Sequence, residues 1–261
     1  MISLGIYFTE KEIVMKINIV SWNCHYGFDK NKPEAINKYE ADILVIPECR
    51  EMDMEVHGYD RKHRDWYGDH KESKDRNGKV NEEKDLGIGV FWKDGITLTR
   101  LLEDDDTSKK ENSFRYVVPY KVQGNFNTFT LVAVWTKAEP FYYDRNVVEA
   151  VKWYRSKGLF ANDTIIIGDF NTFDKGDNRR LDDLEKELSP MINCAKNTKF
   201  HKEPTYYSTR DGFGIDDFCF VSEKFDGKNI KFITHNDWKD ENGKKSWNGS
   251  DHCPISVEFD L

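Results

Sequence analysis

The sequence predicts an α/β fold in which buried strands alternate with helices. Three runs, 17–22, 43–46 and 164–167, are interpreted as strands, and the last two show no polar alternation, which is typical of strands covered on both faces. A helix at 33–40 lies between the first two of these runs, and this β–α–β spacing brings both strand ends to one edge of a sheet. A second helix, with one apolar face, precedes the third run.

Local signals set the bounds of the other elements. Pro33 opens the first helix, because proline is tolerated in the first turn, and Asp144 and Gly158 cap the second. Asp94-Gly95 marks a hairpin turn. The expected helices span 33–40, 144–157 and 179–188. The expected strands span 17–22, 42–47, 86–92, 96–102, 115–122, 128–135, 164–167, 215–222, 230–235 and 254–259.

The chain is expected to form one domain. Residues 1–14 are interpreted as an N-terminal extension, because a clear strand begins only after Met15. No linker-like segment or repeat divides 15–261, so this whole range is assigned to a single catalytic-type domain. The charged stretch 61–85 is expected to be a solvated, mobile loop; the alternative is a substrate-facing loop in which Trp66 and Tyr67 stack.

Composition narrows the possible partners and compartment. The 39 Lys and Arg are outnumbered by 47 Asp and Glu, and a net charge of −8 argues against a broad basic surface for nucleic acid. No apolar run approaches the roughly 20 residues that span a bilayer, so no membrane partner is expected. The first ten residues have neither a basic n-region nor a proper apolar h-region, so no secretory signal is expected, and the five cysteines are scattered without a C-x-x-C pair. We expect a monomeric protein of the reducing cytoplasm.

Polar residues gather where the buried strands end. Asp169 and Asn171 lie two residues apart on an extended backbone, so both side chains reach the same side. Each such residue alone has a structural explanation as a turn former or cap. Their joint occurrence predicts a hard-oxygen site suited to Mg²⁺ or Mn²⁺. The other residues of this set are Asn23, Glu48, Asp216-Asp217 and Ser250-Asp251-His252.

Five segments resemble, in order, the motifs of the endonuclease/exonuclease/phosphatase superfamily, which includes deoxyribonuclease I, exonuclease III and inositol polyphosphate 5-phosphatases. They are Ser21-Trp22-Asn23, Ile46-Pro47-Glu48, Ile167-Gly168-Asp169-Phe170-Asn171, Asp217-Phe218-Cys219-Phe220 and Gly249-Ser250-Asp251-His252-Cys253-Pro254. The resemblance covers 15–261. It implies a four-layer α-β-β-α sandwich with two packed mixed sheets, and a Mg²⁺-dependent phosphoester hydrolase.

The resemblance also implies a role for each matching residue. Glu48 would be the principal Mg²⁺ ligand, with Asn23 and Asp251 beside the metal. Asp169 would orient or deprotonate the attacking water, and Asn171 would hold a phosphate oxygen.

His252 would hydrogen-bond the scissile phosphate, held in its tautomer by Asp217. Asp217 is preferred to Asp216 because the following Phe-x-Phe spacing matches the family strand, although a shift of one residue would reverse the facing.

Two positions depart from the family pattern. Trp135-Thr136 stands where several branches place a second histidine, and His25 stands where many relatives carry Asp or Asn. His25 either contacts the substrate or a metal-bound water, or is a solvated loop residue. Tyr206, Tyr207 and Arg210 fall in a region that borders the substrate in relatives; they would stack on a base or meet a phosphate, or else pack the sheet edge.

A nuclease that cleaves DNA phosphodiesters is the leading functional expectation. Arg61, Lys62 and Arg64 are the candidate local contacts to DNA outside the site. The first alternative is a phosphatase or phosphodiesterase acting on a small phosphorylated metabolite or lipid headgroup. The second, of a different class, is a non-catalytic binding module; it is disfavoured because every catalytic-type position holds a chemically competent residue.

Overall fold

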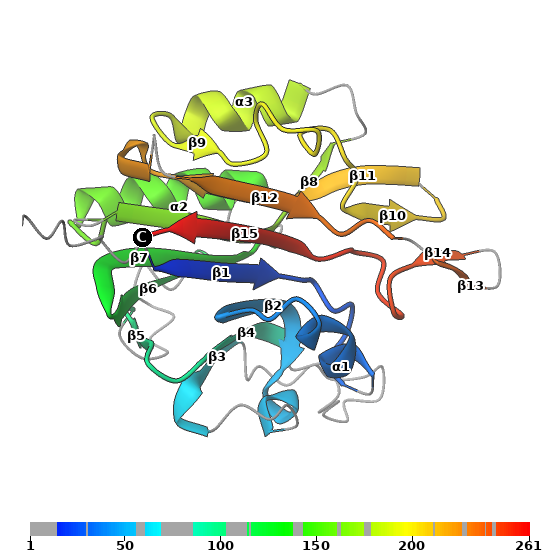
Figure 1. Ribbon diagram of the computed structural model, residues 1–261. Coiled ribbons are helices and arrows are strands. Elements are labelled where there is room, and N and C mark those ends of the chain that lie inside the picture. The colour runs from blue at the N-terminus through cyan, green and yellow to red at the C-terminus, as the bar shows by residue number, and fades with distance from the viewer. Residues whose placement is uncertain are drawn as a thin grey trace, which may run out of the picture.

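The computed structural model describes residues 15–29, 31–55, 61–68, 86–102, 114, 116–137, 143–160, 163–174, 179–210, 212–225, 229–237, 239–241 and 244–261. The predicted extension 1–14 and the 69–85 part of the charged stretch lie outside these residues. Within them, two mixed sheets stack face to face with helices outside (Figure 1). No helix in the described part of the chain is long and apolar enough to cross a membrane.

One sheet has six strands. Only β1 and β2 pair in parallel, and the other neighbours are antiparallel. The strand order is β12 (Ile230–Thr234), β15 (Ile255–Asp260), β1 (Lys16–Ser21), β2 (Ile43–Arg50), β4 (Leu86–Trp92) and β3 (Arg64–Gly68).

The second sheet has seven strands and contains the parallel pair β7–β8. Its order is β10 (Tyr206–Ser208), β11 (Gly212–Val221), β8 (Asp163–Asp174), β7 (Phe126–Trp135), β6 (Val117–Gly124) and β5 (Thr97–Arg100), with β9 (Ile192–Asn193) also paired to β11. A separate hairpin joins β13 (Lys239–Glu241) to β14 (Lys244–Ser246).

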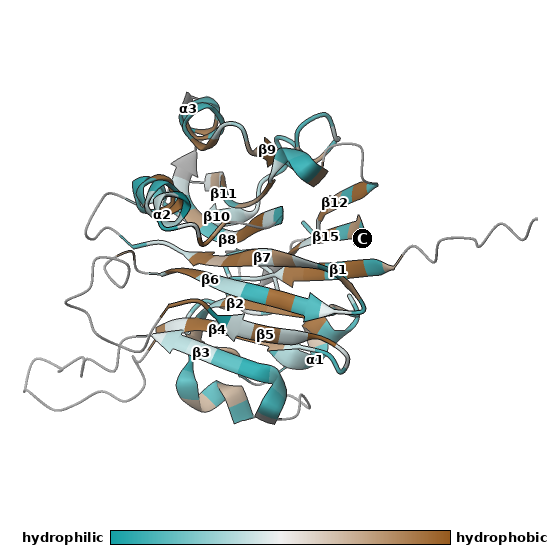
Figure 2. Cartoon of the chain, turned by 90° about the vertical axis from the view of Figure 1, so that its left-hand side faces the viewer, coloured by the Kyte–Doolittle hydropathy of each residue, from teal (hydrophilic) through white to brown (hydrophobic). Residues whose placement is uncertain are grey.

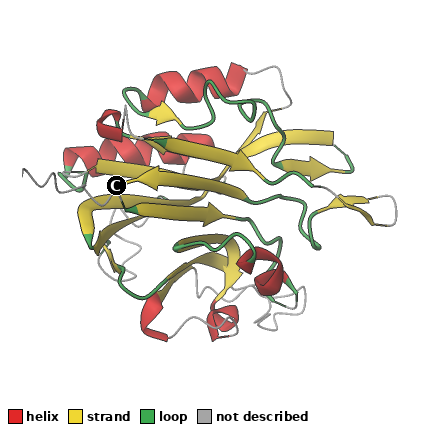
Figure 3. Ribbon diagram, in the orientation of Figure 1, coloured by secondary structure: helices red, strands yellow, loops and turns green. Residues whose placement is uncertain are grey.

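Helices form the two outer layers. Helices α2 (Asp144–Ser156) and α3 (Arg179–Leu188) contact β8 of the seven-stranded sheet. Helix α1 (Lys32–Asn37) and the 3₁₀ helix η1 (Glu51–Glu55) lie outside the six-stranded sheet (Figure 3). Two further 3₁₀ turns span Arg61–His63 and Glu223–Phe225. The predicted four-layer α-β-β-α sandwich is therefore confirmed.

Burial on both faces explains why the central strands lack polar alternation. In β2, Ile43 and Val45 belong to the large core between the sheets, whereas Leu44 and Ile46 face a second cluster under α1. Successive side chains of a strand point to opposite faces, so both sets must be apolar. Figure 2 shows this as hydrophobic colour along the strands and hydrophilic colour on the helices' outer sides.

The expectation of a mobile loop over 61–85 is wrong for 64–68, which form the edge strand β3. Pairing with β4 supplies the backbone hydrogen bonds of this polar segment. The indole of Trp66 donates to the Cys49 carbonyl at 2.9 Å, and Tyr67 is buried in the main core. These two aromatic residues therefore serve packing rather than substrate stacking.

Candidate active site

Strand β2 carries Glu48 on a bulge and then continues to Arg50. The β2–β4 register shifts between Pro47 and Cys49, and Glu48 has a φ of 57°, in the left-handed region. Its carboxylate accepts hydrogen bonds from the Tyr26 backbone N–H at 3.0 Å and from the Asn23 amide at 3.2 Å. The bulge thus fixes a half-buried carboxylate next to the end of β1.

In strand β8, Asp169 follows Gly168, where any larger residue would collide with the backbone of β7. Gly168 has a φ of 146°, and a Cβ there would lie 2.0 Å from the Val134 carbonyl oxygen on β7. Three residues after this glycine, Asn171 adopts a φ of 48°, next to a shift in the β8–β11 register. The close approach of β7 and β8 therefore fixes the positions of Asp169 and Asn171.

The Asp169 carboxylate is fully buried and accepts three hydrogen bonds. Its Oδ1 accepts from the Asn171 backbone N–H at 2.8 Å, and its Oδ2 from the side-chain amides of Asn23 at 2.8 Å and Asn171 at 3.1 Å. Burial raises the pKa of Asp169 well above its usual range, and the charge of His252 opposes that rise. A carboxylate with a raised pKa and a fixed direction is a suitable proton acceptor.

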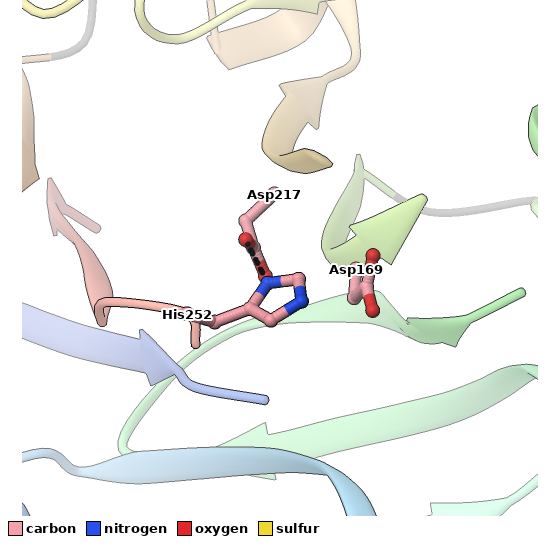
Figure 4. Close-up of side chains that lie close together, drawn as sticks. All are labelled: Asp169, Asp217 and His252. Carbon is pink, nitrogen blue, oxygen red and sulfur yellow. Dashed lines mark hydrogen bonds and ion pairs between the residues drawn. The ribbon is translucent and has the colours of Figure 1, made fainter. Parts of the chain in front are cut away.

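His252 lies between two carboxylates. Its Nδ1 is 2.8 Å from Oδ2 of Asp217, and Figure 4 shows its other ring nitrogen on the side of Asp169. Burial lowers the pKa of His252, but the Asp217 and Asp169 charges outweigh it and raise that pKa well above the usual value. The protonated ring is therefore favoured, and ligand atoms of the three residues all lie within 4.8 Å of one another.

Asp217 and Asp216 point to different partners. The Thr205 hydroxyl accepts both of their backbone N–H groups at 3.0 Å, which pins this part of β11. Asp216 then meets the Thr172 hydroxyl at 3.3 Å, whereas Asp217 meets His252. Of the two candidates, Asp217 is the residue placed to orient the histidine.

The motif before β15 is tied to the end of β1. The Ser250 hydroxyl donates to the Asn23 carbonyl at 2.7 Å and accepts the His252 N–H at 3.0 Å, while the Trp22 indole donates to the His252 carbonyl at 3.0 Å. These bonds place Asp251 beside the exposed His25, whose Nδ1 lies 3.0 Å from the Asp251 carboxylate. Strand ends more than 200 residues apart in sequence therefore meet.

The residues expected near the metal differ in what they offer. Glu48 and Asp251 present half-buried carboxylate oxygens, the donors that Mg²⁺ prefers. Asn23 instead turns its amide N–H₂ to Glu48 and Asp169, while its oxygen accepts the His25 backbone N–H at 2.9 Å. Asn23 thus links the two carboxylates, and its side-chain oxygen, which has two lone pairs, accepts one hydrogen bond from the protein. The donor set as a whole fits a hard divalent cation.

The residues expected to contact substrate are spread over the mouth of the site. The Tyr206 ring packs on His252 with centroids 4.9 Å apart, and Tyr207 packs on Phe213 at 4.9 Å. Arg210 is exposed on the turn after β10. Among the proposed DNA contacts, the Arg64 guanidinium donates to the Met54 carbonyl, and Lys62 lies 3.9 Å from Asp94; nothing is described of the Arg61 side chain.

Structural residues occupy the position where the family that the motifs resemble places a second histidine. Trp135 stacks on Tyr116 with centroids 5.1 Å apart, and the Lys137 ammonium lies 4.4 Å above its ring. The Thr136 carbonyl accepts the Asn171 side-chain amide at 3.0 Å. Sequence reasoning missed the supporting roles of Thr136 and Thr205; their only signal is a threonine at a strand boundary.

Similarity to known proteins is found in structure and not in sequence. No protein-family model and no curated protein sequence matches the chain detectably. Among solved structures, the endonuclease domain of TRAS1, a telomere-specific non-LTR retrotransposon, has a TM-score of 0.59 at 15% identity over 95% of this chain and 99% of its own.

D. rerio TDP2 complexed with single strand DNA product has a TM-score of 0.60 at 12% identity, covering 94% of this chain and 99% of that chain. An endonuclease/exonuclease/phosphatase family protein from Leptotrichia buccalis has a TM-score of 0.57 at 14% identity, covering 94% and 100%. The chain therefore has the endonuclease/exonuclease/phosphatase fold, and the resemblance seen in the sequence motifs is confirmed at the level of the fold.

Proposed function

We propose that this protein is a divalent-metal-dependent phosphoester hydrolase and that DNA is its substrate. The observation that carries the proposal is the buried His252, which lies between Asp217 and Asp169 at the shared edge of both sheets. Because the Asp217 carboxylate pairs with Nδ1, the second ring nitrogen of His252 is the one placed to donate to the oxygen of a bound phosphate (Figure 4). Phosphoester hydrolysis develops negative charge where such a donor is useful.

The protein groups divide the reaction between them. Asp169, aimed by the two asparagine amides, takes a proton from water as its oxygen bonds to phosphorus. His252 donates through its second ring nitrogen to a phosphate oxygen, and Asp217 keeps the ring oriented. The P–O ester bond breaks, and the leaving oxygen takes up a proton.

Glu48 and Asp251 are the residues that would hold the cation, with Mg²⁺ preferred and Mn²⁺ as a substitute. When bound there, the ion supplies charge neutralisation on the phosphate. His25 shares the Asp251 carboxylate and thereby sets the direction of that ligand. Asn23 sets the separation between Glu48 and the catalytic Asp169.

DNA is favoured as substrate by what similar structures contain. The similar structures include an endonuclease domain, a complex with single strand DNA product, and a 3′ phosphatase from Neisseria bound to a product DNA hairpin. The net charge of −8 supports the second candidate, a small phosphate ester, because such a substrate needs no extended basic surface. The two candidates share the proposed chemistry.

The test is a hydrolysis assay on single-stranded DNA, duplex DNA and a small chromogenic phosphodiester, with Mg²⁺, with Mn²⁺ or with chelator. We expect metal-dependent cleavage of at least DNA, and a loss of about 10²–10⁴-fold in Asp169→Asn, which keeps the shape but removes the base. Full turnover by Asp169→Asn at saturating metal would refute the mechanism. Absence of cleavage of every substrate would favour a binding module.

A further inference from the structure

A pocket adjoins the proposed catalytic groups. This pocket has a volume of about 310 Å³ and shares Asp251 and His25 with the site. Lys245 and Ser246 of β14 line it together with Tyr206, Tyr207 and Ser208 of β10, so the β13–β14 hairpin and β10 both contribute to its lining. A substrate bound at His252 would therefore extend into it.

Two residues of the pocket lining, Tyr207 and Lys245, both contact the ring of Phe213, which lies next to the pocket without lining it. Phe213 is 39% exposed, which is unusual for a large apolar side chain, and its ring packs beside Tyr207. The exposed Lys245 ammonium lies 4.7 Å above the Phe213 ring. A flat apolar face next to a positive charge is the combination that binds a base together with its phosphate.

Polar groups inside the pocket are placed for a ligand. The Ser246 hydroxyl is buried and, within the described part of the chain, has no hydrogen-bond partner. The Asp251 carboxylate, the acidic group of the lining, faces His25. The anion-binding side is therefore the hairpin side, away from Asp251.

The volume of the pocket limits the size of the ligand that it can bind. Ligand pockets range from about 300 to 1,000 Å³, so this one is at the small end and suits a single monomer unit. A base held in a duplex is paired and stacked, and its face is not available to Phe213 or Tyr207. Only an unpaired nucleotide exposes both base face and phosphate together.

We propose that this pocket binds one unpaired nucleotide next to the scissile phosphate, with its base against Phe213 and Tyr207 and its phosphate at Lys245. This inference rests on the proposed function and narrows its substrate to single-stranded or frayed nucleic acid. Lys245 and Phe213 are specificity residues supplied by the hairpin and by β11, and neither takes part in the chemical step.

The test measures binding rather than turnover. A short labelled single-stranded oligonucleotide, and the same strand annealed to its complement, are titrated against Asp169→Asn protein by fluorescence anisotropy at several salt concentrations. We expect tighter binding of the single strand. Lys245→Gln should reduce the slope of log affinity against log salt by about 0.7, the value for one phosphate contact on a single strand. Phe213→Ala should weaken binding about fivefold or more.

Lys239→Ala is the matched control, because Lys239 is an exposed lysine of the same hairpin that does not line the pocket. It should keep both slope and affinity. The proposal is overturned if Lys245→Gln and Phe213→Ala bind like Lys239→Ala, or if the duplex binds as tightly as the single strand. Because binding is read in a catalytically disabled protein, loss of the hydrolase proposal and loss of the pocket proposal give separate results.

Discussion

Asn23 connects the two halves of the site at the scale of single residues. One amide nitrogen is shared by Glu48 and Asp169, which come from different sheets, and the amide oxygen is fixed by the His25 backbone N–H. Because a backbone N–H can only donate, this last bond determines which way the amide points. Asn23 thus joins the two carboxylates; beyond this shared amide, Asp169 lies beside His252, whereas Glu48 accepts the Tyr26 backbone N–H.

Removing the charge of Glu48 should weaken metal binding more than folding. Glu48→Gln keeps the size of the side chain, and the residue is only half-buried, so we expect an unchanged Tm without metal. The Mg²⁺ concentration for half-maximal activity should rise by an order of magnitude or more. Glu51→Gln, an exposed acidic residue on the adjacent η1, is the matched control. Full activity of Glu48→Gln at limiting Mg²⁺ would rule out Glu48 as a ligand.

The charge of Asp217 should determine where activity declines at high pH. The Asp217 and Asp169 charges raise the pKa of His252, so the donor form persists to higher pH in the native protein. Asp217→Asn removes one charge, lowers that pKa, and should move the alkaline limb of the kcat/KM profile to lower pH. It should also reduce kcat, because the ring loses its orientation. Asp216→Asn, whose residue contacts Thr172 instead, should move the limb less.

At the scale of elements, the site is built where regular strands are interrupted. Glu48 and Asn171 both have positive φ within β2 and β8, and both coincide with a register shift. Such interruptions cost stability, and they turn a side chain away from the pleat toward the sheet edge. The regular parts of the strands hold the backbone of the site in place, and the irregular positions determine where the Glu48 and Asn171 side chains point.

Gly168 should be irreplaceable for steric reasons. Gly168→Ala brings a Cβ within 2.0 Å of the Val134 oxygen, so β7 and β8 must separate, and we expect a loss of about 1–3 kcal/mol or more in the free energy of unfolding together with loss of activity. Gly158→Ala is the control: its φ is also positive, at 70°, but open space surrounds it. The free energies of unfolding of both variants are measured by chemical denaturation; the loss in Gly158→Ala reports backbone strain alone, and the additional loss in Gly168→Ala reports the steric collision. Equal destabilisation with retained activity would contradict this role.

His235, directly after β12, predicts a pH-dependent stability. Burial lowers the pKa of His235 from 6.5 to about 4, and its ring packs against that of Tyr39, in the segment after α1. Between pH 6.5 and 4, His235 binds a proton in the unfolded chain but stays neutral in the folded protein. The free energy of unfolding therefore decreases as the pH falls through this window, and the full contribution of His235 is present only above pH 6.5. His235→Gln should lose less Tm between pH 7 and 4 than the unmodified protein. An identical decline in both proteins would show that His235 does not contribute.

The fold was largely predictable because its central strands carry a local signal, whereas the parts that shape the pocket do not. Runs such as 43–46 are apolar on both faces, and this requires no knowledge of distant contacts. Strands β3, β10, β13 and β14 are short and contain no apolar run, and only backbone pairing with β4, with β11 or with each other defines them, so the hydrophobic pattern does not predict them. The contact of Asp217 with His252 could be expected from motif order; the supports from Thr136 and Thr205 could not, because they depend on side-chain contacts of buried threonines.

For the whole molecule, charge is the property that most constrains the substrate. Acidic residues exceed basic ones by 47 to 39, and several cations near the site already have partners: Arg64 with Met54, Arg50 with Asp53, and Lys32 with three loop carbonyls. A duplex gripped through many phosphates requires many free cations. The molecule is therefore better suited to a few local phosphate contacts.

Salt should consequently reduce DNA cleavage only moderately. Proteins that make 6–10 phosphate contacts lose about 10³–10⁵-fold in affinity between roughly 50 and 200 mM salt, and we expect this protein to lose far less. Arg61→Glu combined with Lys62→Glu should lower DNA cleavage, since Lys62 is largely exposed, while hydrolysis of a small chromogenic diester should not change. If the protein acts on small phosphate esters instead, those are turned over well, DNA is ignored at every salt concentration, and the charge reversal has no effect. Measuring kcat/KM for both substrates on one preparation, with Asp169→Asn as the control for contaminating nucleases, decides between the two.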